Sequence, residues 1–182
     1  MNRLNKIKKK EMKYYAGIGS RGTPQEILSL MTRLATKLEQ NNWTLRSGGA
    51  RGADSAFKHG IKEYKNCKIY TAESLDYEGN VNAAYKSVDE FHPNPRVLSG
   101  YVRRLMARNY FQVMGKRSGV PSKFIVCWTP DYKLDEEEKV RDAAGGTGQA
   151  IRIAYANKID VYNLKHKQHF EKISSYINKV NT

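Results

Sequence analysis

Two glycine-rich turns of the same kind constrain the fold of this chain more than any other feature. They are residues 17–24 (GIGSRGTP) and 47–54 (SGGARGAD), and a third glycine run, residues 145–148 (GGTG), lies far downstream. The first turn follows the strand-like run 13–18 and the second follows the run 43–46, and each precedes a helical pattern. Glycine lets the backbone take positive φ and lets a ligand lie directly on the main chain. A turn of this composition at a helix N-terminus therefore suits a bound phosphate.

The segment after the first turn has the pattern of an amphipathic helix. Thr23 is predicted as its N-cap, Pro24 as its first helical residue, and Glu26 stands in capping-box register with Thr23. The helix is expected to end near Asn41. Its core-facing stripe consists of apolar residues at three- and four-residue spacing: Ile27, Leu30, Met31, Leu34, Ala35 and Leu38.

The rest of the chain continues the alternation of strands and helices. Further strands are predicted at 67–71, 123–128 and 159–164, and helices at 82–88, 101–114, 149–156 and from about 167 to the C-terminus. Turn-like or proline-punctuated stretches fall at 76–80 and 91–95, and the charged residues 131–141 are expected to form an exposed, mobile excursion. This order predicts a single α/β domain over residues 13–182, with a Rossmann-like, doubly wound, mostly parallel sheet flanked by helices and closed by a C-terminal helix.

Charge and composition narrow the classes of partner. The 32 Lys and Arg residues against 18 Asp and Glu give a formal charge of +14, which favours polyanionic or phosphorylated partners. Part of this excess lies in residues 1–12, expected to be a basic, flexible arm that is either a solvated leader or a nucleic-acid contact. Cys67 and Cys127 lack metal-ligand spacing, so we expect buried thiols, no disulfide, no metal and no cofactor. The chain has no apolar run of membrane-spanning length and no signal-peptide pattern, which predicts a soluble, cytoplasmic protein with no membrane partner.

Some polar and aromatic residues have both a binding and a structural interpretation. Arg21 and Arg51 lie within glycine turns and offer planar donor forks that match a phosphate, although both could be solvated surface charges. Asp54 is expected either to contact a ribose hydroxyl or fix Arg51, or to complement the positive end of a helix. Trp128 and Thr129, at the end of a buried strand, are either core residues or a platform for a base. Several tyrosines alternate with basic residues, which suggests base stacking but is more typical of packing: Tyr14, Tyr15, Tyr64, Tyr70, Tyr77, Tyr85 and Tyr101.

Four motifs in order, residues 17–21, 47–54, 108–109 and 145–148, resemble the SLOG superfamily of Rossmann-like domains. That group includes the DNA-processing protein A (Smf) family and the Lonely Guy (LOG) cytokinin phosphoribohydrolases. The resemblance covers residues 13–164, and the chain looks most similar to stand-alone, phage-encoded proteins that resemble DNA recombination-mediator protein A. It implies glycine turns that cradle a nucleotide or nucleotide-derived ligand, a site-lining role for Arg108 and Asn109, and assembly as a homo-oligomer.

The chain also departs from the family pattern. In LOG-type hydrolases a proline-led glycine run ends in a catalytic glutamate, and the matching positions here are Ala144 and Arg152. A guanidinium cannot replace a carboxylate that stabilises an oxocarbenium-like centre or activates water. We therefore expect binding rather than catalysis. Members of the DNA-processing protein A family usually carry additional domains, whereas this sequence is expected to form the Rossmann-like core alone, which argues against a role as a recombination mediator.

Three functions remain open. In the preferred one, the protein binds a nucleotide-derived small molecule, an ADP-ribose or NAD-derived or cyclic nucleotide signal, and sequesters or senses it as a phage anti-defence protein. The alternative is a single-stranded DNA-binding recombination mediator similar to DNA-processing protein A, which uses the net charge and the basic arm. The third is a LOG-like nucleotide N-glycosidase in which Asp54 or Asp131 replaces the missing glutamate.

All these functions use one predicted site at the carboxyl ends of the strands. Its predicted ligand-binding residues are Gly17, Gly19, Ser20, Arg21, Ser47, Gly48, Gly49, Arg51, Gly52, Asp54, Arg108, Asn109, Trp128, Thr129, Gly145, Gly146, Thr147 and Gly148.

Overall fold

A five-stranded parallel sheet forms the centre of the molecule. The computed structural model describes residues 12–75, 80–116 and 119–179. The strands are β1 (Lys13–Gly17), β2 (Trp43–Ser47), β3 (Cys67–Ile69), β4 (Phe124–Cys127) and β7 (Asp160–Asn163), in the order β3-β2-β1-β4-β7. The chain runs outward from β1 to β3, returns to the other side of β1 and continues outward to β7. This is a doubly wound topology, so the predicted fold class is confirmed, and its switch point lies between β1 and β4.

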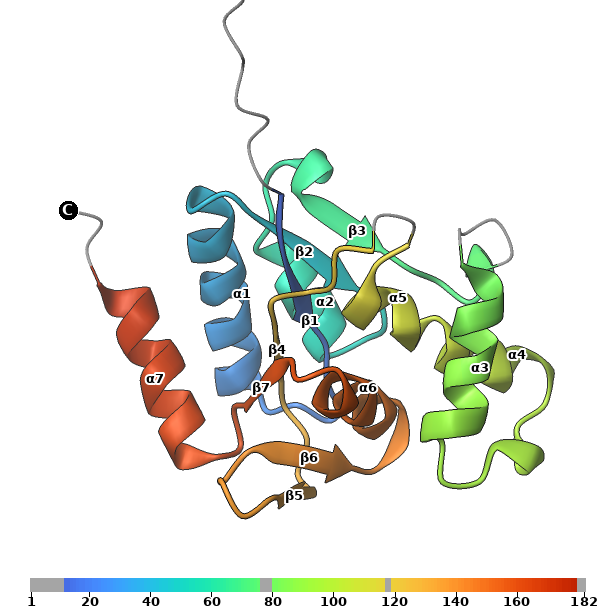
Figure 1. Ribbon diagram of the computed structural model, residues 1–182. Helices are drawn as coiled ribbons and strands as arrows, with labels where there is room; N and C mark the ends of the chain where they lie inside the picture. Colours follow the sequence, from blue (N-terminus) through green and yellow to red (C-terminus); the bar gives the residue numbers. More distant parts are fainter. Residues whose placement is uncertain (1–11, 76–79, 117–118, 180–182) are drawn as a thin grey trace, which may run out of the picture.

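Helices cover both faces of the sheet (Figure 1). One face carries α1 (Gln25–Gln40), α2 (Ala53–His59) and α7 (Lys167–Asn178), which share an apolar core cluster with the sheet. The other carries α5 (Asn109–Met114) and α6 (Gly145–Ala156), with α3 (Val81–Phe91) and α4 (Gly100–Ala107) packed outside them. Short 3-10 turns occupy Tyr64–Asn66 and Pro95–Val97. The domain is single, and each face of the sheet has its own core.

The start of α1 differs from the prediction. The helix begins at Gln25 with Pro24 at the N-cap, and no side chain caps it. The predicted capping box at Thr23 is therefore wrong: the Thr23 hydroxyl donates to the Ser20 carbonyl, 2.7 Å away, and closes the first glycine turn. The predicted end at Asn41 and the six predicted core residues of this helix are confirmed.

The predicted single helix over 101–114 is two helices. It breaks at Arg108, which ends α4 and precedes α5. Arg108 and Asn109 are both buried at the break. Good helix formers lie on both sides, so the apolar periodicity of the sequence does not reveal the change of axis.

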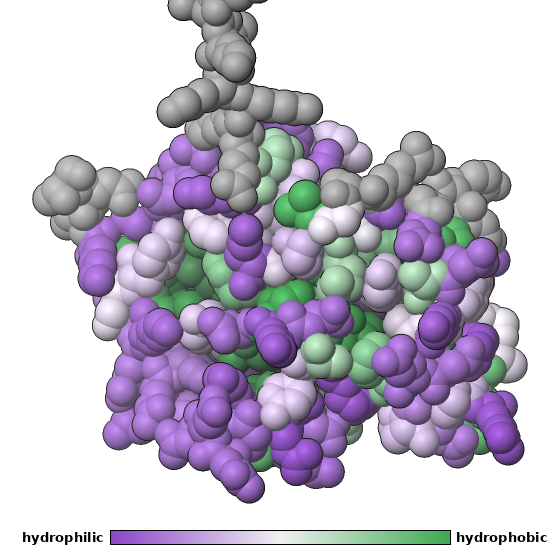
Figure 2. Space-filling model, in the orientation of Figure 1, coloured by the Kyte–Doolittle hydropathy of each residue, from purple (hydrophilic) through white to green (hydrophobic). Residues whose placement is uncertain are grey.

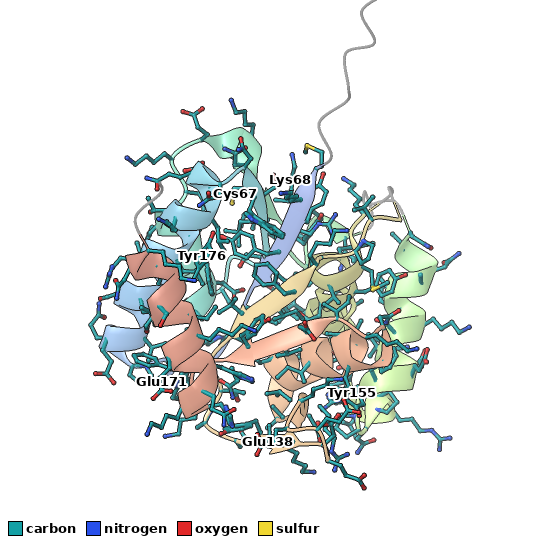
Figure 3. The ribbon with its side chains drawn as sticks, turned by 60° about the vertical axis from the view of Figure 1, so that its left-hand side comes forward. Cys67, Lys68, Glu138, Tyr155, Glu171 and Tyr176 are labelled. Atoms are coloured by element: carbon teal, nitrogen blue, oxygen red, sulfur yellow. The ribbon has the colours of Figure 1, made fainter. Side chains whose placement is uncertain are left out.

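Residues 131–141, predicted as an exposed excursion, belong to a β-hairpin. The prediction is wrong for the hairpin's two strands, which are regular structure and partly buried. β5 (Tyr132–Leu134) and β6 (Val140–Ala143) pair antiparallel, and Val140 and Ala143 are buried in the core beneath α6. The charged residues gather at the exposed tip, where Glu138 lies on the same side of the molecule as Tyr155 of α6 (Figure 3). The Tyr155 hydroxyl donates to Asp135 at 2.9 Å, so the hairpin is fastened to α6.

Arg152 also fastens α6 to its surroundings. Its guanidinium pairs with Asp142 of β6 and donates to the carbonyls of Ala143 and Phe91. Arg152 therefore joins α6 to the hairpin and to the end of α3.

The remaining sequence predictions concern thiols, the surface and the ends of the chain. Cys67 and Cys127 are buried free thiols, as predicted, and burial raises the pKa of Cys127 to about 12. Within the described ranges, none of the helices combines the length and apolar character needed to cross a membrane. Hydrophilic residues dominate the face in Figure 2, and hydrophobic ones show mainly between them. The predicted arm, apart from Met12, and the predicted turn at 76–80, apart from Asn80, lie outside the described residues.

Two glycines of α6 provide a matched test of this packing. A Cβ at Gly148 would collide with the Ala143 carbonyl, whereas a Cβ at Gly146 would meet its nearest atoms at 3.5 Å and 3.6 Å. We expect Gly148→Ala to lower the free energy of unfolding by about 1–3 kcal/mol, because β6 and α6 must separate. Gly146→Ala should be neutral or stabilising by up to about 1 kcal/mol, because alanine favours helix. Urea denaturation measures both, and equal effects would contradict the close packing of α6 on β6.

Candidate nucleotide or phosphate site

A cavity of about 390 Å³ lies at the switch point of the sheet. Its walls are the loops that follow β1 and β4, the start of α6, the second glycine turn and one side of α4 and α5. Doubly wound sheets bind their ligands in this position, at the carboxyl ends of the strands.

The first glycine turn is fitted closely between β4 and α2. Gly19 has a φ of 155°, and a Cβ there would lie 2.8 Å from the Ala53 Cβ and 2.9 Å from the Trp128 carbonyl oxygen. The Ser20 amide donates to that same carbonyl at 3.0 Å. Glycine is therefore required at position 19 for the turn to lie against the end of β4.

The second turn packs directly on the first. Gly52 has a φ of 83°, and a Cβ there would lie 2.7 Å from the Ser20 carbonyl oxygen and 2.8 Å from the Arg21 Cα. This contact brings Arg21 and Arg51 onto neighbouring turns, where both side chains are exposed. Neither arginine forms an ion pair or a side-chain hydrogen bond with any residue in the described ranges. Both guanidinium groups are thus available to an anion.

Two buried charges form the base of the cavity. Asp54 and Arg108 are 4% and 8% exposed and line the cavity, yet they are not within ion-pair distance of each other. Burial raises the pKa of Asp54 to about 6, while Arg108 and the amide of Ala50 act against that shift. Burial lowers the pKa of Arg108, and Asp54 opposes this. The Nε of Arg108 has no hydrogen-bond partner in the described protein.

The third glycine run forms the first turn of α6, and its first three residues, 145–147, line the cavity. Gly145 has a φ of 64°, and the Asn109 amide donates to the Gly146 carbonyl at 3.1 Å. Asp131 receives the Ala144 amide at 3.1 Å and the Thr129 hydroxyl at 3.1 Å, so it ties the loop after β4 to the start of α6. The N-terminus of this 12-residue helix adds positive potential at the cavity wall.

The structure brings ten of the predicted ligand-binding residues to the cavity wall. They are Gly19, Ser20, Arg21, Asp54, Arg108, Asn109, Thr129, Gly145, Gly146 and Thr147. Their role in binding stays a prediction.

The other eight predicted residues lie behind or beside the cavity: Gly17, Ser47, Gly48, Gly49, Arg51, Gly52, Trp128 and Gly148. Several have structural contacts instead. Gly17 leaves room for the Phe57 ring, Gly48 for the Arg108 guanidinium, and the Ser47 hydroxyl donates to the Gly17 carbonyl at 2.7 Å. Trp128 is buried in the core between the sheet and α1.

Eight lining residues were missed by the sequence analysis: Ile18, Ala50, Leu105, Met106, Gln112, Pro130, Asp131 and Ala144. Some of them had a readable signal. Leu105 and Gln112 stand three residues before and four after Arg108, so helical spacing places them near its side. Asp131 was considered only as a substitute catalytic carboxylate.

Comparison with known proteins gives one informative likeness. No family model matches the chain, and no curated protein matches it. The chain is similar to the solved structure of DNA processing protein A from Helicobacter pylori, described for its single-stranded DNA binding mode. The TM-score is 0.57 at 19% identity, over 91% of this chain and 79% of that one. At this identity the likeness shows a fold like that of DNA processing protein A. The resemblance to the wider superfamily and to its phage-encoded members stays a prediction.

The raised pKa of Asp54 predicts an unusual dependence of stability on pH. Its folded-state pKa of about 6 exceeds its ordinary value of 3.8, so the folded protein favours the protonated form. Below pH 4 the Asp54 carboxyl is neutral in both the folded and the unfolded state, so it does not change the free energy of unfolding. As the pH rises from 4 to 6, ionisation of Asp54 lowers the free energy of unfolding. Above pH 6 this loss reaches a constant value of up to about 3 kcal/mol.

Replacing Asp54 with asparagine tests this directly. Relative to Asp54→Asn, the wild-type free energy of unfolding should fall between pH 4 and pH 6 and then level off. Urea denaturation at several pH values measures the difference. A difference between the two proteins that is constant over this range would show that Asp54 is ionised normally.

Proposed function

We propose that this protein binds single-stranded nucleic acid across the carboxyl edge of its sheet. The observation that carries the proposal is the pair of exposed, unpaired arginines, Arg21 and Arg51, on two glycine turns that touch each other beside a cavity. Guanidinium groups and free amides at such turns hold phosphates well.

Charge and fold support the same proposal. The net charge of +14 favours a polyanion and gives a binding free energy that depends on salt. The structural neighbour from Helicobacter pylori, which shares the fold, is described as binding single-stranded DNA. The basic residues of segment 1–12 contribute to this net charge.

In this proposal the phosphates and the bases of the strand contact different parts of the site. Arg21 lines the cavity, and so does the first turn of α6, whose N-terminus contributes positive potential. A strand that passes along this edge would place its phosphates at the two turns and one nucleotide over the cavity. Single strands suit such a site because their bases are not held in a duplex.

A second candidate is a nucleotide-derived small molecule, as the sequence led us to expect. The observation in its favour is the cavity itself, because about 390 Å³ is within the usual range for small-molecule pockets and two buried charges, Asp54 and Arg108, line it. Sequestration of a signal in phage anti-defence, and assembly as a homo-oligomer, belong to this candidate. Isothermal titration with ADP-ribose and cyclic nucleotides tests it: tight binding with unchanged recovery of the ligand would favour it over the strand.

Removing one turn arginine should weaken strand binding and its salt dependence together. For a fluorescently labelled oligothymidylate, Arg21→Ala or Arg51→Ala should lower the affinity and reduce the slope of log K against log salt by about 0.7, because each loses one phosphate contact. Fluorescence anisotropy at several salt concentrations measures both quantities.

Lys65→Ala is the matched control for these variants. Lys65 is exposed and lies in the 3-10 turn before β3, at the opposite edge of the sheet. The Lys65→Ala substitution removes one positive charge, as the arginine variants do, but removes it far from the two turns. It should therefore leave the slope of log K against log salt nearly unchanged. Equal losses in all three variants would mean that net charge alone drives binding, and the assignment of the site to the two turns would fail.

A further inference from the structure

An exposed apolar strip on α4 leads out of the cavity. Leu105 and Met106 line the cavity wall. Tyr101 lies four residues before Leu105, and Val102 lies four residues before Met106. Residues four apart lie on the same face of a helix, so the strip runs from the cavity to the surface. Tyr101 is 56% exposed and Val102 is 45% exposed.

The Tyr101 ring is held in place beside the cations of the site. Its hydroxyl donates at 2.9 Å to the carboxylate of Glu73, which lies in the loop that follows β3. Arg108 and Arg21 are close enough to act on its pKa, which the hydrogen bond to Glu73 raises. The ring is therefore fixed at its hydroxyl end while much of the residue's surface remains accessible to solvent.

Two of the large exposed apolar side chains of the described residues, Tyr101 and Val102, lie on this strip. Val97, 68% exposed, precedes the strip in the chain, whereas the most exposed aromatic residue, Tyr64 at 90%, stands apart at the other edge of the sheet. Trp128, the aromatic residue that the sequence suggested as a platform, is 8% exposed. The helix that carries this accessible ring lines the same cavity as Arg21, the proposed phosphate ligand, and an aromatic ring beside a cation has the composition of a base-stacking surface.

We propose that Tyr101 stacks against a base of the bound strand, with Val102 extending the apolar contact and the adjacent phosphate held at Arg21. This inference rests on the proposed function and specifies which part of the strand α4 recognises. It assigns the bases to the strip on α4 and the phosphates to the glycine turns. A face that instead bound another protein would show no dependence on nucleic acid bases.

The test compares two strands and three variants. The strands are a labelled oligothymidylate and a strand of the same length whose nucleotides are abasic, so that it keeps the phosphates and lacks the bases. The variants are Tyr101→Ala, Tyr101→Phe and the control Tyr64→Ala. Because all three substitutions are at exposed positions, thermal denaturation should show an unchanged melting temperature.

Stacking predicts a specific pattern of affinities. Tyr101→Ala should weaken binding of the oligothymidylate by roughly 5- to 150-fold, the effect expected for one stacked base. It should leave binding of the abasic strand unchanged. Tyr101→Phe keeps the ring and should retain nearly all of the affinity, and Tyr64→Ala should match the wild type.

Other outcomes overturn the inference. If Tyr101→Ala weakens both strands equally, or if Tyr101→Phe loses as much as Tyr101→Ala, the residue acts through its hydrogen bond to Glu73 rather than by stacking. If Tyr101→Ala binds the oligothymidylate with the same affinity as the wild type, the stacking assignment fails while the proposed function stands. If the wild type binds neither strand, the proposed function fails with it.

Discussion

The close contact between the first two glycine turns determines the geometry of the whole carboxyl edge. Gly52 lies against the Ser20 carbonyl, and Gly19 lies against Ala53 and the end of β4. A side chain at either position would push the turns apart, since both also have a φ that L-residues rarely adopt. The contact joins the end of β1 to the start of α2. Both exposed arginines and the mouth of the cavity depend on that junction.

Two charges are buried beneath this edge without forming a pair. Burying ions costs free energy unless they are paired or hydrogen-bonded. Asp54 accepts a hydrogen bond from the Ala50 amide at 3.3 Å, and Arg108 donates to the Tyr70 carbonyl at 3.4 Å, but the two side chains are not within ion-pair distance of each other. The Nε of Arg108 has no hydrogen-bond partner in the described structure. Gly48 is needed to make room for this arginine. A fold gains nothing from such an arrangement by itself. Unfavourable groups of this kind are typical of binding sites, where a ligand supplies the missing interactions.

The sequence predicts the doubly wound parallel sheet better than it predicts the residues that line the cavity. Glycine turns, apolar strands and helical spacing identify the parallel sheet because they are local signals. The hairpin was missed because its charged tip hides the two buried residues Val140 and Ala143. Trp128 and Tyr101 could not be told apart as platforms, since the exposure of an aromatic ring depends on tertiary packing. Glycines that serve a ligand and glycines that serve packing, such as Gly148, look the same in the sequence.

Arg152, which stands where the sequence resemblance would place a catalytic glutamate, has a structural role in this fold. It does not line the cavity but links α6 to Asp142 and to the carbonyls of Ala143 and Phe91. Of the carboxylates in the described chain, the cavity wall includes Asp54 and Asp131. Both oxygens of Asp131 already accept hydrogen bonds, from Thr129 and the Ala144 amide, so its position is fixed by the loop that it closes. Any hydrolytic reaction at this cavity would therefore have to use Asp54, the same carboxylate whose ionisation destabilises the fold. Binding makes no such demand, because a phosphate is held by cations and amides and does not require Asp54 to be ionised.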